Sequence, residues 1–241
     1  MSLLEIKDMT KNFGGLYAVK DVNISIDKGE VVGLIGPNGA GKTTLFRLIS
    51  GFYKPTSGQV TFKGENITGL KPNEICKRGL SRTFQIVQPF HGLTVEQNVQ
   101  VAAFNRYNKT GQTIDKAREV LEFVDLIDKK NFRADTLTIA DRKKLEVAKA
   151  YATEPEIILF DEVMSGLNPK ETEETIALIQ KIADRGVTIF LIEHVMRVVM
   201  TLAERITVIH HGEKLAEGTP KEIQKDEKVI EAYLGEAIDI A

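Results

Sequence analysis

A glycine-rich turn between a strand and a helix is the feature that most restricts how this chain can fold. Residues 36–43 read GPNGAGKT and match the pattern G-x-x-x-x-G-K-[ST]. The apolar segment VVGLI (31–35) comes directly before this turn, and the helical pattern TLFRLI (44–49) follows it. A strand that leads through a short turn into a helix is the first half of a βαβ unit. The sequence therefore predicts a fold of the α/β class.

Short apolar runs alternate with amphipathic stretches in the second half of the chain as well. Residues 157–160 and 188–192 are predicted to be strands, and residues 172–183 and 196–203 the helices that follow them. Strands that are apolar throughout are typical of a parallel sheet covered on both faces. Other segments instead alternate apolar and polar residues, as half-exposed antiparallel strands do: 3–9, 22–26 and 59–62. We therefore expect a main parallel sheet flanked by a small antiparallel β layer.

A stretch without strand signals interrupts this alternation between residues 94 and 153. Its apolar residues recur at helical spacing, for example Val120, Leu121 and Val124. The polar segment NRYNKTG (105–111) is the best loop candidate inside it. We expect residues 1–88 and 154–241 to form the core with its β layer, and residues 89–153 to form an inserted helical subdomain.

Composition excludes several classes of protein. The chain has 241 residues, 42% of them hydrophobic, and 32 Lys and Arg against 34 Asp and Glu, which excludes disorder and fibrous repeats. With a net charge of −2 the chain has no overall positive potential that would attract a nucleic acid, so we expect no nucleic-acid partner. The single cysteine, Cys76, cannot form an internal disulfide or a CxxC site. No apolar run approaches the roughly 18 residues of a membrane span, and no signal peptide is evident, which predicts a cytoplasmic location.

The chemistry of the turn points to a phosphate group. Gly36, Gly39 and Gly41 allow successive backbone N–H groups to face an anion, and the helix that follows adds its positive end. Lys42 is expected to reach the β- and γ-phosphates of a nucleotide, and the Thr43 hydroxyl to bind Mg²⁺. The alternative is a structural turn with an incidental lysine, which both flanking segments disfavour. The other expected members of this phosphate loop are Asn38, Ala40 and Thr44.

Two adjacent acids, Asp161 and Glu162, end the apolar run that begins at residue 157. Ionised carboxylates at the end of a buried strand are unfavourable unless a cation or hydrogen bonds compensate them. A magnesium nucleotide would do so, with Asp161 holding Mg²⁺ and Glu162 accepting the proton of the attacking water. The alternative for an isolated pair is two acids at the exposed end of a strand.

With these residues in place, the order of motifs resembles the nucleotide-binding subunits of ATP-binding cassette (ABC) transporters over essentially the whole chain. The resemblance implies a P-loop NTPase (RecA-like) core that binds ATP and Mg²⁺. It also implies that Phe13 stacks on adenine, that Gln85 senses Mg²⁺ and water, and that His194 contacts the γ-phosphate. Gly166, in SGLNP (165–169), would belong to a loop that crosses to a second subunit.

The signature motif departs from the family pattern. The usual L-S-G-G-Q stands here as LTIAD (137–141). In the family this segment binds the ATP of the opposite subunit, so the resemblance implies that role for Thr138 and Ala140. The alternative is a structural one, in which Thr138 and Asp141 resemble a capping box at the start of a helix. The sequence leaves both interpretations open.

Within the family, the segments 79–99, 145–169 and 217–223 look most like the ATPases of branched-chain amino acid importers. The resemblance implies membrane permease subunits, a second ATPase subunit in a homo- or heterodimer, and indirectly a solute-binding protein. It places the chain on the inner face of the cell membrane. Two alternatives remain: a cassette ATPase that works without a permease, and a regulatory ATP-binding module that hydrolyses weakly.

Overall fold

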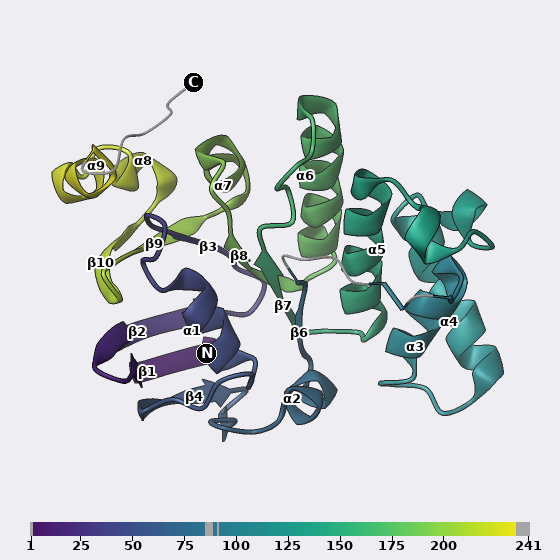
Figure 1. Ribbon diagram of the computed structural model, residues 1–241, viewed down its shortest axis with the longest axis horizontal. Coiled ribbons are helices and arrows are strands. Elements are labelled where there is room, and N and C mark those ends of the chain that lie inside the picture. Colours follow the sequence, from purple (N-terminus) through teal and green to yellow (C-terminus); the bar gives the residue numbers. More distant parts are fainter. Residues whose placement is uncertain (1, 85–88, 91, 235–241) are drawn as a thin grey trace. The chain divides into compact units, whose positions relative to one another are not determined.

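The computed structural model describes residues 2–84, 89–90 and 92–234. The chain divides into two compact units, of which the first combines Met1–Pro72 with Thr188–Ala241 and the second is Asn73–Val187. Figure 1 shows their helices and strands. The segment that we expected to form a helical subdomain, residues 89–153, falls entirely within the second unit.

The first unit contains an antiparallel sheet in which each strand pairs with its neighbour in the order β2-β1-β4-β5. Ile6 of β1 lies opposite Ile24 of β2. Along the last part of β2, Ile24 and Ile26 are buried while Ser25 is exposed, so one face of the sheet is apolar. The predicted antiparallel strands are confirmed. The four strands are β1 (Ser2–Phe13), β2 (Leu16–Asp27), β4 (Ser57–Phe62) and β5 (Glu65–Asn66).

The first unit also contains the parallel strands that carry the glycine-rich turn. Strand β3 pairs in parallel with β8 and β9, and β10 returns antiparallel to β9. Every residue of β3 and β8 is buried, which confirms the prediction made from their apolar runs. The turn between β9 and β10 consists of His211 and Gly212. The strands are β3 (Val31–Ile35), β8 (Thr188–Ile192), β9 (Arg205–His210) and β10 (Glu213–Gly218).

Helices cover both faces of these parallel strands. Phe46 of α1 (Lys42–Ile49) packs on Phe190 of β8, with ring centroids 4.9 Å apart. Phe190 lies beside Val32 in the sheet, so the next residue of β3, Gly33, faces the opposite side. There a Cβ atom on Gly33 would lie 2.6 Å from Val199 of α7 (Met196–Leu202). The first unit ends in α8 (Pro220–Ile223) and α9 (Glu227–Leu234).

The second unit is mainly helical. After α2 (Pro72–Arg78), the short strand β6 (Leu80–Arg82) pairs in parallel with β7 (Ile157–Asp161). Between these strands, α3 packs against both α4 and α5, which confirms the predicted helical stretch (Figure 1). The helices of the unit after α2 are α3 (Val95–Ala103), α4 (Thr110–Phe123), α5 (Ile139–Ala152) and α6 (Pro169–Asp184), with 3-10 turns at Ile127–Lys129 and Ala134–Thr136.

Several helix boundaries differ from the prediction by one to three residues, and two of them concern helix starts in the second unit. Helix α4 begins at Thr110, so the polar loop ends earlier than the expected residue 111. Helix α6 begins at Pro169 rather than at residue 172, because the Asn168 side chain caps it and Glu171 completes a capping box. Its first turn is polar, and apolar spacing therefore does not reveal it. Among the described residues, no helix combines the length and the apolar character that a membrane crossing requires.

Candidate nucleotide site

The glycine-rich turn of the first unit lies against the backbone of two strands. At Gly36, a Cβ atom would lie 2.0 Å from the carbonyl oxygen of Ile209, at the end of β9. At Gly41, it would lie 2.2 Å from the carbonyl oxygen of Ala18 in β2. Both glycines have positive φ, of 152° and 106° respectively. Only glycine fits such close approaches, so the path of the turn is determined by its sequence.

The Lys42 side chain lies inside this turn and bonds to its backbone. The residue is 5% exposed, and its ammonium donates hydrogen bonds to the carbonyl oxygens of Gly36, at 2.6 Å, and Pro37, at 2.8 Å. The tip residues Asn38 and Gly39 are exposed, whereas Ala40 is buried. The turn thus surrounds a cation, which is the arrangement that an anion-binding loop requires.

The start of α1 adds a second anion-binding feature. Its N-cap is Gly41, which provides no side-chain hydrogen bond to the first-turn amides. Uncapped first-turn N–H groups and the positive end of the helix dipole favour a phosphate. Thr43 and Thr44 lie in this first turn and are partly exposed. The predicted loop residues, 36–44, are therefore brought together at one end of β3.

Two further predicted residues belong to the first unit. Phe13, at the end of β1, is 43% exposed, and its ring contacts Tyr53 edge-on with centroids 5.5 Å apart. The Lys11 ammonium lies 4.9 Å from the centroid of the same ring. The aromatic ring is thus supported yet accessible. His194 is also exposed, in the connection between β8 and α7.

In the second unit, Asp161 ends β7 with its side chain fully buried. One carboxylate oxygen, Oδ2, accepts a hydrogen bond from Arg82 Nη2 of β6 at 2.6 Å. The other oxygen, Oδ1, is buried and has no hydrogen-bond partner among the described residues. A buried carboxylate oxygen without a partner is unusual, and oxygen is the donor that Mg²⁺ prefers. Asp161 therefore fits the predicted role of a magnesium ligand.

Replacing Arg82 by methionine tests how much the ion pair between Arg82 and Asp161 contributes to the stability of the protein. Arg82→Met leaves a buried carboxylate without its counter-charge, so we expect the free energy of unfolding to fall by about 3–5 kcal/mol. Urea unfolding of the full chain measures this change. Arg133→Met is the matched control, because Arg133 forms an ion pair of the same 2.6 Å length with Asp135 on the surface of the same unit. Equal losses in the two variants would contradict the prediction, since exposed ion pairs contribute little.

Glu162 follows Asp161 with an unusual backbone. Its φ of 51° lies in the left-handed region, which is strained by about 1–3 kcal/mol for a residue other than glycine. The residue is 8% exposed. Its carbonyl oxygen accepts hydrogen bonds from Lys143 Nζ at 3.1 Å and from the Ser165 amide at 3.3 Å. After Asp161 the chain therefore leaves β7 through a turn that begins at Glu162. The turn continues to Gly166, whose φ is 79°.

The altered signature segment starts helix α5, with Thr138 as N-cap. The Thr138 hydroxyl accepts a hydrogen bond from the Asp141 amide at 3.2 Å and donates one to Asp141 Oδ2 at 2.9 Å. Lys129 Nζ also contacts Asp141 Oδ2, at 2.6 Å. The Thr138 cap of the predicted alternative is therefore present, but the Asp141 carboxylate accepts from the Thr138 hydroxyl and not, among the hydrogen bonds of the described residues, from the Thr138 amide as in a complete capping box. The Asp141 charge is paired with a lysine. Ala140 is partly exposed in the first turn of the helix.

The structure assigns each predicted site residue to one unit. The loop, Phe13 and His194 belong to the first unit, whereas Asp161, Glu162, Gly166, Thr138 and Ala140 belong to the second. Gln85 lies outside the described residues. Sequence reasoning missed Arg82, Lys129 and Lys143. The sequence offers no clear signal for them: the strand that carries Arg82 is only three residues long, too short to show a pattern.

Models of known protein families match two segments of this chain. The model of the ABC transporter family matches residues 19–165, which include the glycine-rich loop and the paired acids. A second model, described as a branched-chain amino acid ATP-binding cassette transporter, matches residues 213–239. Both matches agree with the resemblance carried by the motifs.

Individual relatives extend the similarity to nearly the whole chain. The high-affinity branched-chain amino acid transport ATP-binding protein BraF of Pseudomonas aeruginosa is 42% identical, over 98% of each chain. The protein LivG of Escherichia coli K12, with the same description, is 41% identical over 98% of each chain.

Solved structures show the same fold. The crystal structure of a nucleotide-free ATP-binding cassette from an ABC transporter superposes with a TM-score of 0.89 and 31% identity, over 98% of this chain and 100% of that chain. A dimeric cassette in a post-hydrolysis state, bound to ADP and Pi, gives a TM-score of 0.82 and 28% identity, over 90% and 98% of the two chains.

Proposed function

This chain belongs to the ATP-binding cassettes of ABC transporters, and we propose that it hydrolyses ATP to power an importer of branched-chain amino acids. The observation that carries the proposal is the 42% identity, over nearly the full length, to a high-affinity branched-chain amino acid transport ATP-binding protein. The family match at residues 213–239 supports the same class of importer. In such a transporter the solute passes through membrane permease subunits, whereas this chain supplies the energy.

ATP would be held mainly by the first unit. The loop at residues 36–43 and the uncapped start of α1 supply backbone N–H groups for the phosphates, and Lys42 supplies a positive charge. To reach a phosphate, the Lys42 ammonium would exchange its two carbonyl acceptors for phosphate oxygens. Phe13 would offer its exposed ring to the adenine base.

We propose that Mg²⁺ binds through Thr43, Asp161 and Gln85. The observation that supports a Mg²⁺ site is at Asp161, whose buried Oδ1 has no hydrogen-bond partner among the described residues. When bound, Mg²⁺ would neutralise charge that develops on the phosphates during transfer. Arg82 would keep the other oxygen of Asp161 occupied, so that one oxygen faces the metal and one anchors the strand.

Glu162 would act as the general base toward the attacking water. A base must be held in one position to be effective, and the left-handed turn at Glu162 provides such a hold. His194 would contact the γ-phosphate from the exposed connection after β8.

A second cassette subunit is part of the proposal, because a solved relative with 28% identity is a dimeric cassette bound to ADP and Pi. Thr138 and Ala140 would face the ATP of this second subunit. The Thr138 hydroxyl is engaged in its own helix cap, and Asp141 brings a paired carboxylate to the same turn. These features favour weaker phosphate binding by this segment than a glycine-rich one would give.

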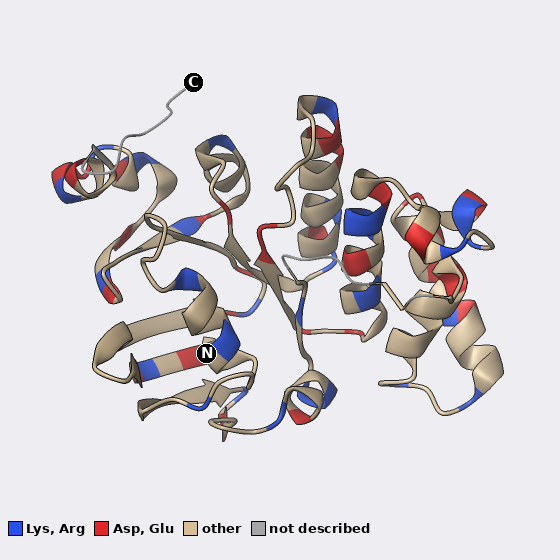
Figure 2. Cartoon of the chain, in the orientation of Figure 1, with Lys and Arg blue, Asp and Glu red and all other residues tan. Residues whose placement is uncertain are grey.

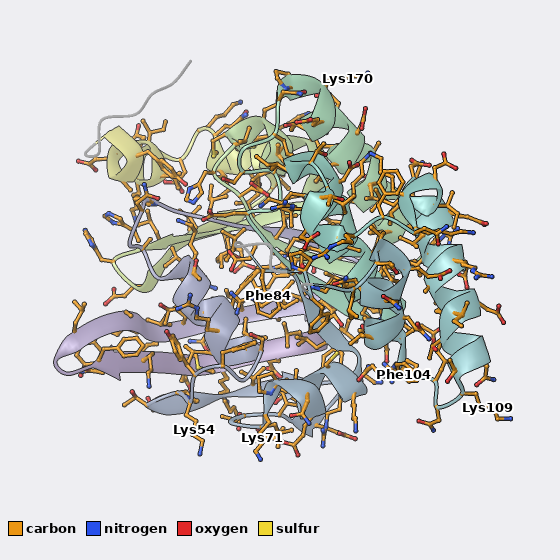
Figure 3. The ribbon with its side chains drawn as sticks, turned by 45° about the vertical axis from the view of Figure 1, so that its right-hand side comes forward. Lys54, Lys71, Phe84, Phe104, Lys109 and Lys170 are labelled. Atoms are coloured by element: carbon orange, nitrogen blue, oxygen red, sulfur yellow. The ribbon has the colours of Figure 1, made fainter. Side chains whose placement is uncertain are left out.

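The permease partners would bind the second unit, and the chain would thereby associate with the inner face of the membrane. Exposed aromatic side chains are typical anchors of protein interfaces. Phe84, which follows β6, is 43% exposed, and Phe104, the C-cap of α3, is 46% exposed (Figure 3). Phe90 is 49% exposed. A solute-binding protein would act on the permease and not on this chain.

Uptake measurements test the importer function. Cells that lack this chain should lose most of their high-affinity uptake of labelled leucine, isoleucine and valine, and the wild-type chain should restore it. The physical reason is that accumulation against a gradient requires the coupled hydrolysis of ATP. Uptake of labelled proline by a separate carrier is the control. Unchanged leucine, isoleucine and valine uptake would contradict the proposed solute class.

Purification from detergent extracts distinguishes the importer hypothesis from the alternative of a cassette ATPase that works without a permease. In the importer, an integral membrane permease should accompany the chain through purification. A chain that turns over ATP but never retains a membrane protein would support the alternative.

A further inference from the structure

Helix α5 carries a lysine whose charged end is buried. Lys143 is 5% exposed, and its ammonium donates a hydrogen bond to the carbonyl oxygen of Glu162 at 3.1 Å. Figure 2 shows basic and acidic residues one after another along α5. The neighbouring Lys144 instead pairs with Glu174, whose side chain is 45% exposed. Lys143 is therefore the lysine of this pair that points toward the turn after β7.

The acceptor of this hydrogen bond belongs to a strained residue. Glu162 has φ 51°, a conformation that side-chain-bearing residues adopt only when the surroundings hold them there. Its carbonyl oxygen accepts from two donors, Lys143 Nζ and the Ser165 amide. The Ser165 bond lies within the turn itself, whereas the Lys143 bond ties the turn to another element. The lysine thus fixes the peptide plane from which the Glu162 side chain departs.

The charge of Lys143 is compensated along its own helix. Glu146 is 3% exposed, and its Oε1 contacts Lys149 Nζ at 2.6 Å. Burial raises the pKa of Glu146, while the charges of Lys149 and Lys143 act in the opposite direction. A buried ammonium that is compensated in this way can donate a strong hydrogen bond to a carbonyl.

We propose that Lys143 is a positioning residue for Glu162: through the carbonyl oxygen it holds the left-handed turn that aims the general base. The inference rests on the proposed role of Glu162. It also links the start of α5, where Thr138 caps the helix, to the catalytic turn, because Lys143 lies in the second turn of the same helix. A small displacement of a base can lower the rate strongly. The phosphate loop belongs to the first unit and Asp161 lies in β7 before the turn, so we expect a much smaller effect on nucleotide binding.

Steady-state ATP hydrolysis and equilibrium nucleotide binding of the full chain test this proposal. In Lys143→Met the stem remains and the donor is lost, so kcat should fall at least about tenfold while the Kd for MgATP stays within about twofold. Lys143→Arg keeps a donor and should recover most of kcat. Lys144→Met is the matched control, since it removes an ion pair from the same helix without touching Glu162, and its kcat should equal that of the wild type. Urea unfolding verifies that each variant is folded, and Lys143→Leu, which also lacks a donor, replaces Lys143→Met in the test if the latter does not fold.

A double variant distinguishes positioning from a general loss of structure. In a Glu162→Gln background, Lys143→Met should cause no further loss of kcat, because the group it positions is already gone. A further loss of about tenfold in that background, or a wild-type kcat in Lys143→Met, would overturn the inference. A Glu162→Gln variant with wild-type turnover would instead refute the proposed function of Glu162 itself.

Discussion

Glu162→Gln should retain MgATP binding and lose at least about 99% of the ATP turnover. Glutamine preserves the shape of the side chain but cannot accept a proton from water, and general bases typically contribute a factor of about 10²–10⁴ to the rate. The backbone turn should survive, because its two hydrogen bonds come from Lys143 and from the Ser165 amide to a carbonyl oxygen that glutamine also has. Phosphate release at saturating MgATP measures kcat, and a fluorescent ATP analogue measures the Kd.

Glu171→Gln is the matched control for this experiment. Glu171 follows on the same segment and forms the capping box of α6 with Asn168, a role that glutamine also fills. This variant should hydrolyse ATP at the wild-type rate. Equal turnover in wild type and Glu162→Gln would exclude Glu162 as the base. An inactive wild type would favour the regulatory module over the motor ATPase.

The same variant also tests the dimer. When ATP is bound but not hydrolysed, two cassettes that share it should stay together, so Glu162→Gln should elute as a dimer with MgATP and as a monomer with MgADP. The engaged cap at Thr138 and Asp141 favours a weaker dimer for this chain alone than for a mixture with a cassette whose signature is glycine-rich. Size-exclusion chromatography at several protein concentrations measures both.

The strands of this fold could be predicted because burial on both faces selects apolar residues. The runs at Val31–Ile35 and Thr188–Ile192 are strands β3 and β8 with the predicted bounds. Strand β6 could not be predicted, since three residues are too few to show a pattern. Helix starts were predicted less well than helix bodies. The polar first turn of α6 is specified by the Asn168 cap and by Pro169, and apolar spacing carries no information about it.

The residue types of the candidate site could be predicted, but their partners could not. Gly36 and Gly41 are recognisable because the backbone there leaves no room for a Cβ atom, and Lys42 because its ammonium lies among the backbone groups of the loop. Arg82 and Asp161 stand 79 residues apart, and nothing in either local sequence indicates that they pair. The bond from Lys143 to a backbone carbonyl is harder still to predict, because any residue at position 162 would supply the same acceptor.

Lys42→Ala should weaken MgATP binding at least about a hundredfold and abolish turnover. In the structure the ammonium bonds the carbonyl oxygens of Gly36 and Pro37, and with nucleotide it would bond phosphate oxygens instead. Hydrogen bonds between charged groups contribute about 1.5–3 kcal/mol each, so the loss of two corresponds to at least two orders of magnitude in Kd. Calorimetric titration with MgATP measures the affinity, and urea unfolding without nucleotide verifies the fold.

The control for this substitution must remove a lysine that the loop does not enclose. Lys20→Ala removes a lysine of the same unit that pairs with Glu213 on the surface, and it should bind MgATP as the wild type does. Lys42→Met separates the two roles of Lys42, because its apolar stem fills the loop but has no charge for a phosphate. If the ammonium serves only to close the loop, Lys42→Met will lose stability and keep its affinity for MgATP. If it binds phosphate, affinity will fall in Lys42→Met as far as in Lys42→Ala, even where the methionine variant is the more stable of the two.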